Sequence, residues 1–256
     1  QYYGLMYLVA FGLTYVMVRY RLTRENRFDV SLEHVQGLLT AMIVGLILGA
    51  RLGYVVFYNA AYYMSHPLEI LLPFDFSGGM RFTGISGMSY HGGLIGVILA
   101  ALYYTRRNRL SFLEMADLFI PGIPLGYTFG RLGNFINGEL YGRVTTAKIG
   151  MYFPQTGDNA TRHPSQLYEA FFEGIVLFGL LWLLRRRIRL SGAMLGIYLI
   201  GYGTVRFFIE FARQPDDHLG FVWRSFSMGQ LLCAAMILSG AGILTWLARG
   251  RRTSVQ

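Results

Sequence analysis

The chain has 256 residues, of which 54% are hydrophobic, 16% aromatic and only 14% charged. That polar share is too small to cover a soluble domain of this length, so a lipid bilayer is the expected solvent. The formal net charge of +9 is typical of basic loops beside anionic lipid headgroups, and no nucleic-acid partner is expected.

Apolar runs near 20 residues recur along the chain, and each matches the ~30 Å hydrocarbon core of a bilayer. Helices satisfy their own backbone hydrogen bonds there. The sequence therefore predicts an all-α polytopic membrane protein, with residues 1–256 as a single integral membrane domain. Seven spans are expected, over residues 2–18, 34–58, 88–104, 112–130, 166–184, 193–211 and 226–247. Pro121 and Pro124 predict a kink in the fourth span.

Arginine-rich loops alternate with loops that are poor in uncompensated positive charge, where Arg213, for example, is balanced by Asp216 and Asp217. The rich loops follow the first, third, fifth and last spans, and the positive-inside rule makes them cytoplasmic. The N-terminus is then outside and the C-terminus cytoplasmic. Two outward segments exceed the length of a turn. Residues 59–87 are expected to form an extracytoplasmic or interfacial arm, and residues 136–165 a small extracytoplasmic cap.

The cysteine and histidine content argues against metal and redox chemistry. Cys233 is the only cysteine and lies in an apolar run, as a small core residue does. The five histidines lack metal-ligand spacings such as HExxH. Neither a metal nor another cofactor is expected.

Polar residues within spans are costly, which makes their positions informative. The densest group lies at the outer end of the fourth span, in GRLGNFINGELYGR, residues 130–143. It contains Arg131, Asn134, Asn137, Glu139 and Gly142. A guanidinium beside amide donors suits a phosphate or carboxylate ligand. The alternative is an arginine that snorkels to the interface, with glycine turns behind it.

A second group lies in YGTVRFFIEFAR, residues 202–213, near the outer end of the sixth span. Tyr202, Arg206 and Glu210 are spaced by four and share one helix face. One interpretation is an intrahelical ion pair that satisfies itself. The other is that Glu210 holds the Arg206 guanidinium in a fixed orientation toward a ligand.

A third group is MSYHGGLIG, residues 88–96, at the outer mouth of the third span. Histidine side chains titrate near neutrality, so His91 is a candidate proton acceptor, or else a helix–helix hydrogen-bond partner. Arg162 to Glu169, in RHPSQLYEA, are expected to be polar anchors at an outer helix end. The topology places Arg131, Arg206, Glu139 and His91 at the outer leaflet. This convergence favours one outward-opening site for an amphiphile with an anionic head and acyl tails.

The order and spacing of these strings resemble the bacterial prolipoprotein diacylglyceryl transferase family through nearly the whole chain. The opening YYGLMY also matches that family's first span. The resemblance implies functional positions at Tyr3, His91, Arg131, Asn134, Glu139, Gly142, Tyr202, Arg206 and Glu210. Asn137 and Arg162 lie in the same strings and are expected to contact substrate.

The reaction implied by the resemblance moves the diacylglyceryl group of phosphatidylglycerol onto the lipobox cysteine thiol of a preprolipoprotein. A thioether forms and glycerol-1-phosphate leaves, at the outer leaflet of the bacterial inner membrane. The implied partners are phosphatidylglycerol, the preprolipoprotein signal peptide and lipobox, and the lipid bilayer. His91 is then expected to accept the thiol proton, and Arg131 and Arg206 to stabilise the leaving phosphate. Asn134 and Tyr3 would position the headgroup.

Rival functions fit less well. A lipid or solute transporter, or a non-catalytic membrane scaffold, explains the spans and the basic loops equally well. It does not explain why polar groups gather on the outer side without continuing to the cytoplasmic side. An intramembrane protease is disfavoured because the chain has neither a GxSx nucleophile elbow nor paired intramembrane aspartates.

Overall fold

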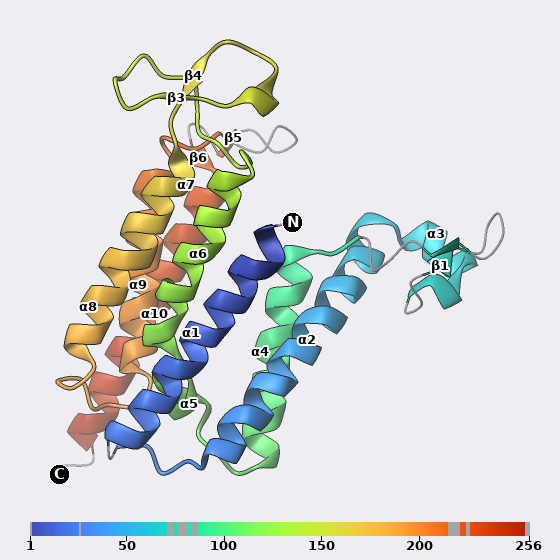
Figure 1. The fold of residues 1–256 in the computed structure, drawn as a ribbon. Coiled ribbons are helices and arrows are strands. Elements are labelled where there is room, and N and C mark those ends of the chain that lie inside the picture. Colours follow the sequence, from blue (N-terminus) through green and yellow to red (C-terminus); the bar gives the residue numbers. More distant parts are fainter. Residues whose placement is uncertain are drawn as a thin grey trace. The chain divides into compact units, whose positions relative to one another are not determined.

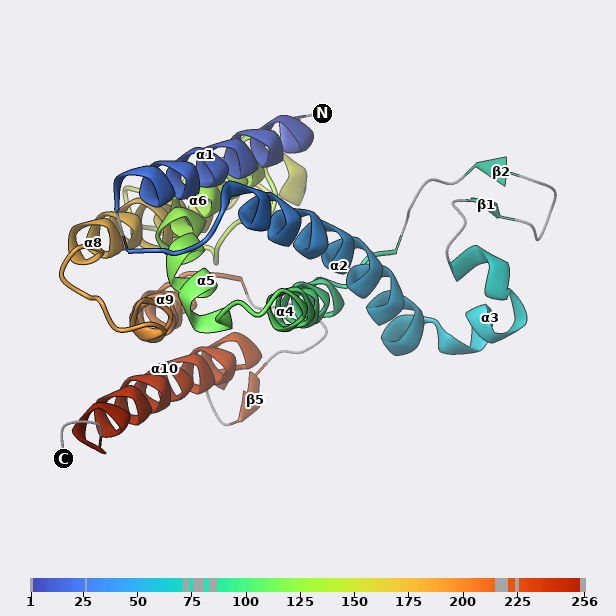
Figure 2. The ribbon, with the colours of Figure 1, turned by 90° about the horizontal axis from the view of Figure 1, so that it is seen from below.

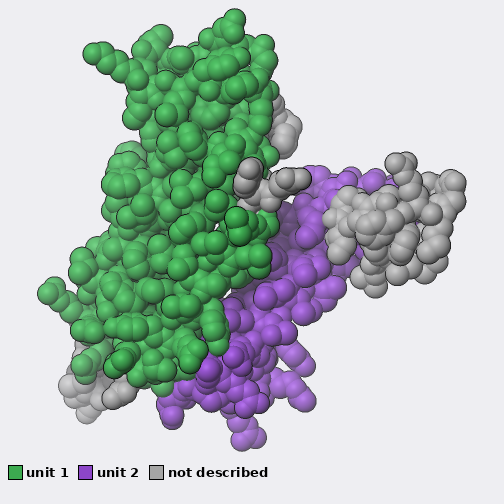
Figure 3. Space-filling model, viewed as in Figure 1, with its two compact units in different colours: residues 1–28, 113–256 green, residues 29–112 purple. Residues whose placement is uncertain are grey.

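A computed structural model describes residues 2–25, 27–70, 74–75, 81–82, 87–214, 221–223 and 226–253. Helices dominate these residues, and the strands are only two or three residues long. The chain divides into two compact units (Figure 3). The first comprises Gln1–Phe28 and Leu113–Gln256, and the second Asp29–Phe112. The mainly helical class predicted from composition is confirmed, whereas a single membrane domain over residues 1–256 stays a prediction.

The first unit is a helical bundle (Figures 1 and 2). Its helices are α1 (Tyr2–Arg24), α5 (Phe112–Phe119), α6 (Ile123–Ile136), α7 (Ser165–Tyr168), α8 (Leu177–Leu184), α9 (Ala193–Ile209) and α10 (Met228–Thr253). A π-helical segment, η4 (Glu169–Val176), joins α7 to α8. α1 packs on α6, α6 on η4, and α9 on α10.

The fourth predicted span is broken as expected. Between α5 and α6 the chain forms a 3-10 turn, η2 (Ile120–Gly122). Pro121 and Pro124 lack the backbone N–H that a continuous α-helix requires, which is why the hydrogen-bond pattern changes here. The predicted kink is confirmed.

The π-helical segment η4 is fitted closely against α6. A Cβ at Gly174 would overlap the Thr128 hydroxyl, so only glycine allows this approach. The same hydroxyl, Thr128 Oγ1, lies 3.4 Å from the Ala170 carbonyl oxygen and 3.1 Å from that of Pro124. A π-helical turn inserts a residue into the helix and is frequent at functional sites.

Short strands gather at one end of the first unit, beyond the end of α6 and the start of α7 (Figure 1). β3 (Met151–Tyr152) pairs antiparallel with β4 (Thr161–Arg162), and a 3-10 turn, η3 (Pro154–Thr156), lies between them. β5 (Phe221–Trp223) pairs with β6 (Phe226–Ser227). Residues 137–164 thus form an insertion between α6 and α7, and the predicted extracytoplasmic cap over residues 136–165 stays a prediction.

The other end of the first unit contains a buried polar network. The Arg21 side chain is fully buried, donates to the Asp117 and Leu118 carbonyls at 2.6 and 2.7 Å, and pairs with Glu25. Arg185 also pairs with Glu25, at 2.9 Å. Asp117 accepts backbone N–H groups at the start of α9 and pairs with Arg27. Arg21, Arg27 and Arg185, which count as loop charges in the sequence, are thus paired with acids inside the protein.

The second unit consists of a helix pair and an arm. Its elements are α2 (Leu32–Tyr58), α3 (Ala60–Ser65), a 3-10 turn η1 (Pro67–Ile70), β1 (Phe74–Asp75), β2 (Arg81–Phe82) and α4 (Tyr90–Arg107). α2 and α4 meet backbone to backbone, because a Cβ on Gly49 would overlap the Gly92 carbonyl oxygen. Arg51 of α2 donates to the Ile70 and Glu69 carbonyls and so ties the arm to the helix.

Within the described residues, four helices are long and apolar enough to cross a membrane, namely Gly4–Arg24, Leu32–Tyr58, Ser165–Leu184 and Met228–Gly250. Ala193–Ile209 is apolar but shorter. The fourth predicted span is divided by η2 into shorter pieces, and α4 ends in Arg106 and Arg107. The chain is a multi-pass membrane protein, and the predicted total of seven spans is not confirmed.

Candidate active site

A single buried carboxylate lies at the centre of the candidate site. Glu169, the first residue of η4, is 0% exposed. Its Oε2 lies 2.6 Å from Arg131 Nε of α6, and its Oε1 lies 2.9 Å from Arg206 Nη1 of α9. Arg213, just beyond α9, donates to the same Oε1 at 3.0 Å. Glu169 therefore joins three arginines that are far apart in the sequence.

Two further glutamates surround Arg206. Glu210 Oε2 lies 3.2 Å from Arg206 Nη2, as the spacing of four predicted, and the Ser227 hydroxyl donates to Glu210 Oε1. Glu173 Oε1 lies 3.7 Å from Arg206 Nη1. The guanidinium is thus held from several sides, which fixes its orientation more firmly than one ion pair would.

The cations and the carboxylates differ in exposure. The side chains of Arg131, Arg206 and Arg213 keep 13–16% of their surface exposed, whereas Glu169 and Glu173 keep 0–1%. The arginine side chains therefore keep more exposed surface than the two acids do. Three guanidinium groups at one end of an apolar bundle suit an anionic ligand with an apolar body.

Polar and aromatic groups line the same cluster. Arg131 donates from Nε to the Tyr127 hydroxyl at 2.7 Å and from Nη1 to Asn134 Oδ1 at 3.3 Å. The Tyr127 hydroxyl also donates to Glu169. The Tyr202 ring meets the Tyr127 ring edge-on at 5.9 Å between centroids. Arg131, Asn134, Tyr202, Arg206 and Glu210, all predicted from the sequence, belong to one constellation.

The insertion is tied to this constellation by its backbone. Gly142 N–H donates to the His163 carbonyl and forms a bridge with Arg213, and a Cβ there would overlap the Ala212 carbonyl oxygen. Arg143 donates to the carbonyls of Arg213 and Glu210. Only glycine permits this contact, and the predicted contact of Gly142 with substrate stays a prediction.

Three more predicted residues lie at the end of α6 and in the insertion. Asn137 caps the end of α6, and its carbonyl accepts from Gln155. The Glu139 side chain is exposed, and its carbonyl accepts from Gln166. Arg162 pairs with Asp158 at 2.7 Å and stacks on the Tyr141 ring. Hydrogen bonds from Arg162 and Thr156 lower the pKa of Asp158 below its ordinary value.

His91 and Tyr3 are the two other predicted site residues, and they belong to α4 and α1. His91 is exposed at the start of α4, in the second unit, where its ring packs edge-on against Tyr90. Ser89 caps this helix by accepting from Gly92 N–H. Tyr3 belongs to α1, but its side chain lies outside the described residues. The predicted participation of both residues stays a prediction.

Sequence reasoning missed four members of the cluster. The sequence predicts Glu169 only as a polar anchor and Arg213 only as a loop charge balanced by Asp216 and Asp217, and it does not single out Tyr127 or Glu173. Arg213 pairs with Glu169, while Asp216 and Asp217 lie outside the described residues. A usable signal was present, because two carboxylates spaced by four inside an apolar run are costly in a membrane.

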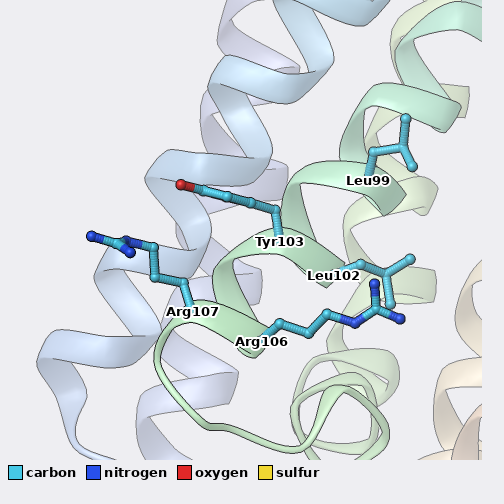
Figure 4. A pocket seen from close by; sticks show the side chains of 5 residues that line it. All are labelled: Leu99, Leu102, Tyr103, Arg106 and Arg107. Carbon is cyan, nitrogen blue, oxygen red and sulfur yellow. The ribbon is translucent and has the colours of Figure 1, made fainter.

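Other candidate sites have less chemical content. An open groove on α4 is lined by Leu99, Leu102, Tyr103, Arg106 and Arg107 (Figure 4). Its lining side chains include two arginines but no carboxylate or histidine. No group of three or more His, Cys, Asp or Glu side chains that could hold a metal occurs in the described part of the chain.

The chain matches known proteins over nearly its whole length. The model of the family described as prolipoprotein diacylglyceryl transferase matches residues 1–246. The phosphatidylglycerol–prolipoprotein diacylglyceryl transferase of Chlorobaculum tepidum is 55% identical over 96% of this chain and 85% of the relative. Enzymes of the same name from Bordetella parapertussis and Treponema denticola are 47% and 43% identical, over 96% and 93% of this chain and 90% and 86% of the relatives.

A helical membrane bundle with a buried arginine–glutamate cluster at one end defines a multi-pass membrane protein with a polar site. The family match and the relatives' names add the chemistry. The chain belongs to the prolipoprotein diacylglyceryl transferase family, and it is a transferase.

Proposed function

We propose that this chain transfers the diacylglyceryl group of phosphatidylglycerol to a prolipoprotein. Family membership and the names of the relatives support this substrate pair. The acceptor is the lipobox cysteine thiol beside the signal peptide, the product is a thioether, and glycerol-1-phosphate leaves. The observation that carries the proposal is the cluster in which the buried Glu169 carboxylate holds the guanidinium groups of Arg131 and Arg206.

The cluster's chemistry fits this reaction. As the bond between the glyceryl carbon and the phosphate oxygen breaks, negative charge grows on the departing phosphate. Arg131 and Arg206 stabilise that charge, and they are oriented before substrate arrives because Glu169 and Glu210 hold them. Asn134 and Tyr3 position the headgroup. The apolar bundle receives the acyl chains.

His91 accepts the thiol proton in this proposal. A thiol with a pKa near 8.5 is mostly protonated at neutral pH, so a base beside it raises the thiolate fraction. His91 is exposed and sits at a helix start next to small residues, which leaves its ring reachable. The nucleophile belongs to the substrate, and Cys233, which is buried in α10, has no chemical part.

The proposed orientation places the cluster at the outer leaflet of the bacterial inner membrane. Internal pairing of Arg21, Arg27 and Arg185 reduces the free positive charge of two loops. Exposed arginines remain near the ends of α1, α4 and α8 or just beyond them, namely Arg19, Arg24, Arg106, Arg107, Arg109, Arg186, Arg187 and Arg189. Their excess still favours a cytoplasmic location for these loops, with the N-terminus outside.

A reconstitution assay tests the function. Purified protein is incubated with phosphatidylglycerol and a lipobox peptide, and the peptide mass is followed by mass spectrometry. A gain of one diacylglyceryl group is expected, with glycerol-1-phosphate released in equal amount. A peptide with serine in place of the cysteine should stay unmodified. Lipid movement across the bilayer without any peptide modification would favour the transporter and refute the transferase.

A further inference from the structure

We propose that Glu173 is a positioning residue for Arg206, holding its guanidinium where the leaving phosphate needs it. The proposal rests on the proposed function, because it assumes that Arg206 faces the phosphate. The argument comes from its contacts, its burial and the helix geometry around it.

Glu173 and Glu169 flank the same guanidinium nitrogen. Arg206 Nη1 lies 2.9 Å from Glu169 Oε1 and 3.7 Å from Glu173 Oε1. Glu210 contacts the other terminal nitrogen, Nη2, at 3.2 Å. Glu173 therefore acts on the end of the guanidinium that Glu210 does not reach, and the two together limit its rotation.

The burial of Glu173 argues against a role in packing alone. Its side chain is 0% exposed, and neither carboxylate oxygen has a hydrogen bond of ordinary geometry, although the Tyr127 side chain also interacts with it. A buried carboxylate with few hydrogen bonds is expensive, and a glutamine or an apolar residue would fill the space at lower cost. The Arg206 charge is what compensates it.

The π-helical segment determines where Glu173 lies. η4 spans Glu169 to Val176 and so contains both glutamates. Gly174, the residue next to Glu173, lies against Thr128 of α6, in the helix that contributes Arg131. The contact that fixes η4 against α6 is thus adjacent to Glu173, and it sets this acid relative to the helix that carries Arg131.

The charges of the cluster predict how removal of the Glu173 charge should affect lipid binding and turnover. Arg131, Arg206 and Arg213 pair with Glu169, Glu173 and Glu210, so the formal charges of these six side chains balance. Removing the Glu173 charge leaves one positive charge in excess. An anionic lipid should then bind more tightly in its ground state, while a less constrained Arg206 stabilises the transition state less well.

The first test separates kcat from KM. Glu173→Gln keeps the shape of the side chain and removes its charge, and we expect kcat to fall by about 10- to 100-fold while the KM for phosphatidylglycerol falls by about 3- to 10-fold. Glu173→Asp keeps the charge on a shorter chain and should recover part of kcat. Glu33→Gln, which changes an exposed glutamate in α2, is the matched control with wild-type constants. Unchanged constants in Glu173→Gln, or a rise in KM, would overturn the proposal.

A second test needs no turnover. Binding of phosphatidylglycerol to the purified protein is measured for wild type, Glu173→Gln, Arg206→Gln and the double variant. The gain in affinity from Glu173→Gln should disappear when Arg206 is absent, because the effect acts through that guanidinium. An equal gain in both backgrounds contradicts the positioning role. If wild type binds the lipid without modifying the peptide, the transferase proposal fails while the coupling between Glu173 and Arg206 is still decided.

Discussion

Glu169 is the residue on which the site depends most. It is fully buried and lies within 3.0 Å of three guanidinium groups from α6, α9 and the segment after α9. Breaking a buried ion pair costs more than an exposed one because the remaining charges stay desolvated. Removing this one carboxylate would leave three arginines without their common partner.

Replacing Glu169 by glutamine should therefore reduce both stability and activity. We expect a loss of about 3–5 kcal/mol in folding free energy, seen as a lower melting temperature in detergent, and transfer activity near background. Glu33→Gln serves as the exposed control. A Glu169→Gln protein with wild-type melting temperature and turnover would show that the three contacts are dispensable.

Arg131 and Arg206 should each be needed for the chemical step. Arg131→Ala and Arg206→Ala are expected to cost ~2–4 kcal/mol of transition-state stabilisation, or roughly 30- to 1000-fold in kcat/KM. Arg206→Lys should recover only part, because an ammonium cannot meet Glu169 and Glu210 through separate nitrogens as Arg206 does. Steady-state kinetics with a lipobox peptide measure this. Normal turnover in Arg131→Ala would refute the phosphate-site assignment.

His91 gives a prediction about pH. His91→Gln should lose activity at neutral pH and recover partly as pH rises toward ~8.5, where solvent supplies the thiolate. Wild type should be less dependent on pH over the same range. Rates measured from pH 6 to pH 9 test this, and a profile parallel to wild type would make His91 a structural hydrogen-bond partner.

At the scale of the elements, the contact between η4 and α6 sets the distance between Glu169 and Arg131. A methyl group at Gly174 would overlap the Thr128 hydroxyl and push the two helices apart. Both ends of the ion pair would then move relative to each other. Packing at one glycine thus decides the geometry of charged groups on two helices.

Gly174→Ala should consequently lower stability by about 1–3 kcal/mol through overpacking, and lower kcat beyond what the loss of folded protein explains. Thr128→Ala removes the overlapping hydroxyl, so the double variant should recover part of both. Gly179→Ala is the matched control, because its Cβ would meet nothing within 4 Å. Melting curves and kinetics of the single and double variants test this prediction. A Gly174→Ala protein with the same melting temperature and kcat as Gly179→Ala would contradict the role of this contact.

Local patterns of the sequence predicted the contacts within single helices. The spacing of four gave the Arg206–Glu210 pair, the spacing of three gave Arg131 beside Asn134, and Pro121 located the break before α6. Contacts between helices were not predictable in this way. Glu169 meets Arg131, Arg206 and Arg213 only because η4, α6 and α9 pack together, and no spacing along the chain encodes that.

The number of arginines in a loop does not give its free positive charge, because some of these side chains are buried. Arg21 contributes to a basic loop in the sequence, yet it is fully buried and bonded to the Asp117 and Leu118 carbonyls. Arg213 counts as a loop charge in the sequence, and in the structure it binds the buried Glu169. Long arginine side chains reach partners on other helices, so a count of residues by loop overstates the free charge.

At the scale of the whole molecule, the proposed orientation can be tested by labelling. Cys233→Ala should retain activity, because the attacking thiol belongs to the substrate, and it provides a background without cysteine. Cysteines introduced at Arg107 and Arg187 should be shielded from impermeant thiol reagents in intact cells, whereas one at Asn159, which is exposed in the insertion, should react. The reverse pattern would place the cluster on the cytoplasmic side.

The backbone contact between α2 and α4 has a consequence for sequence variation. Exposed apolar residues of α2, such as Ile43 and Leu48, can be replaced by other apolar residues, since any apolar side chain is compatible with lipid. Gly49, Gly92 and Gly96 have no such latitude, because even a methyl group would occupy the space of the opposite main chain. In a saturation mutagenesis library selected for growth, the exposed apolar positions of this helix pair should therefore tolerate many substitutions. The three glycine positions should tolerate none.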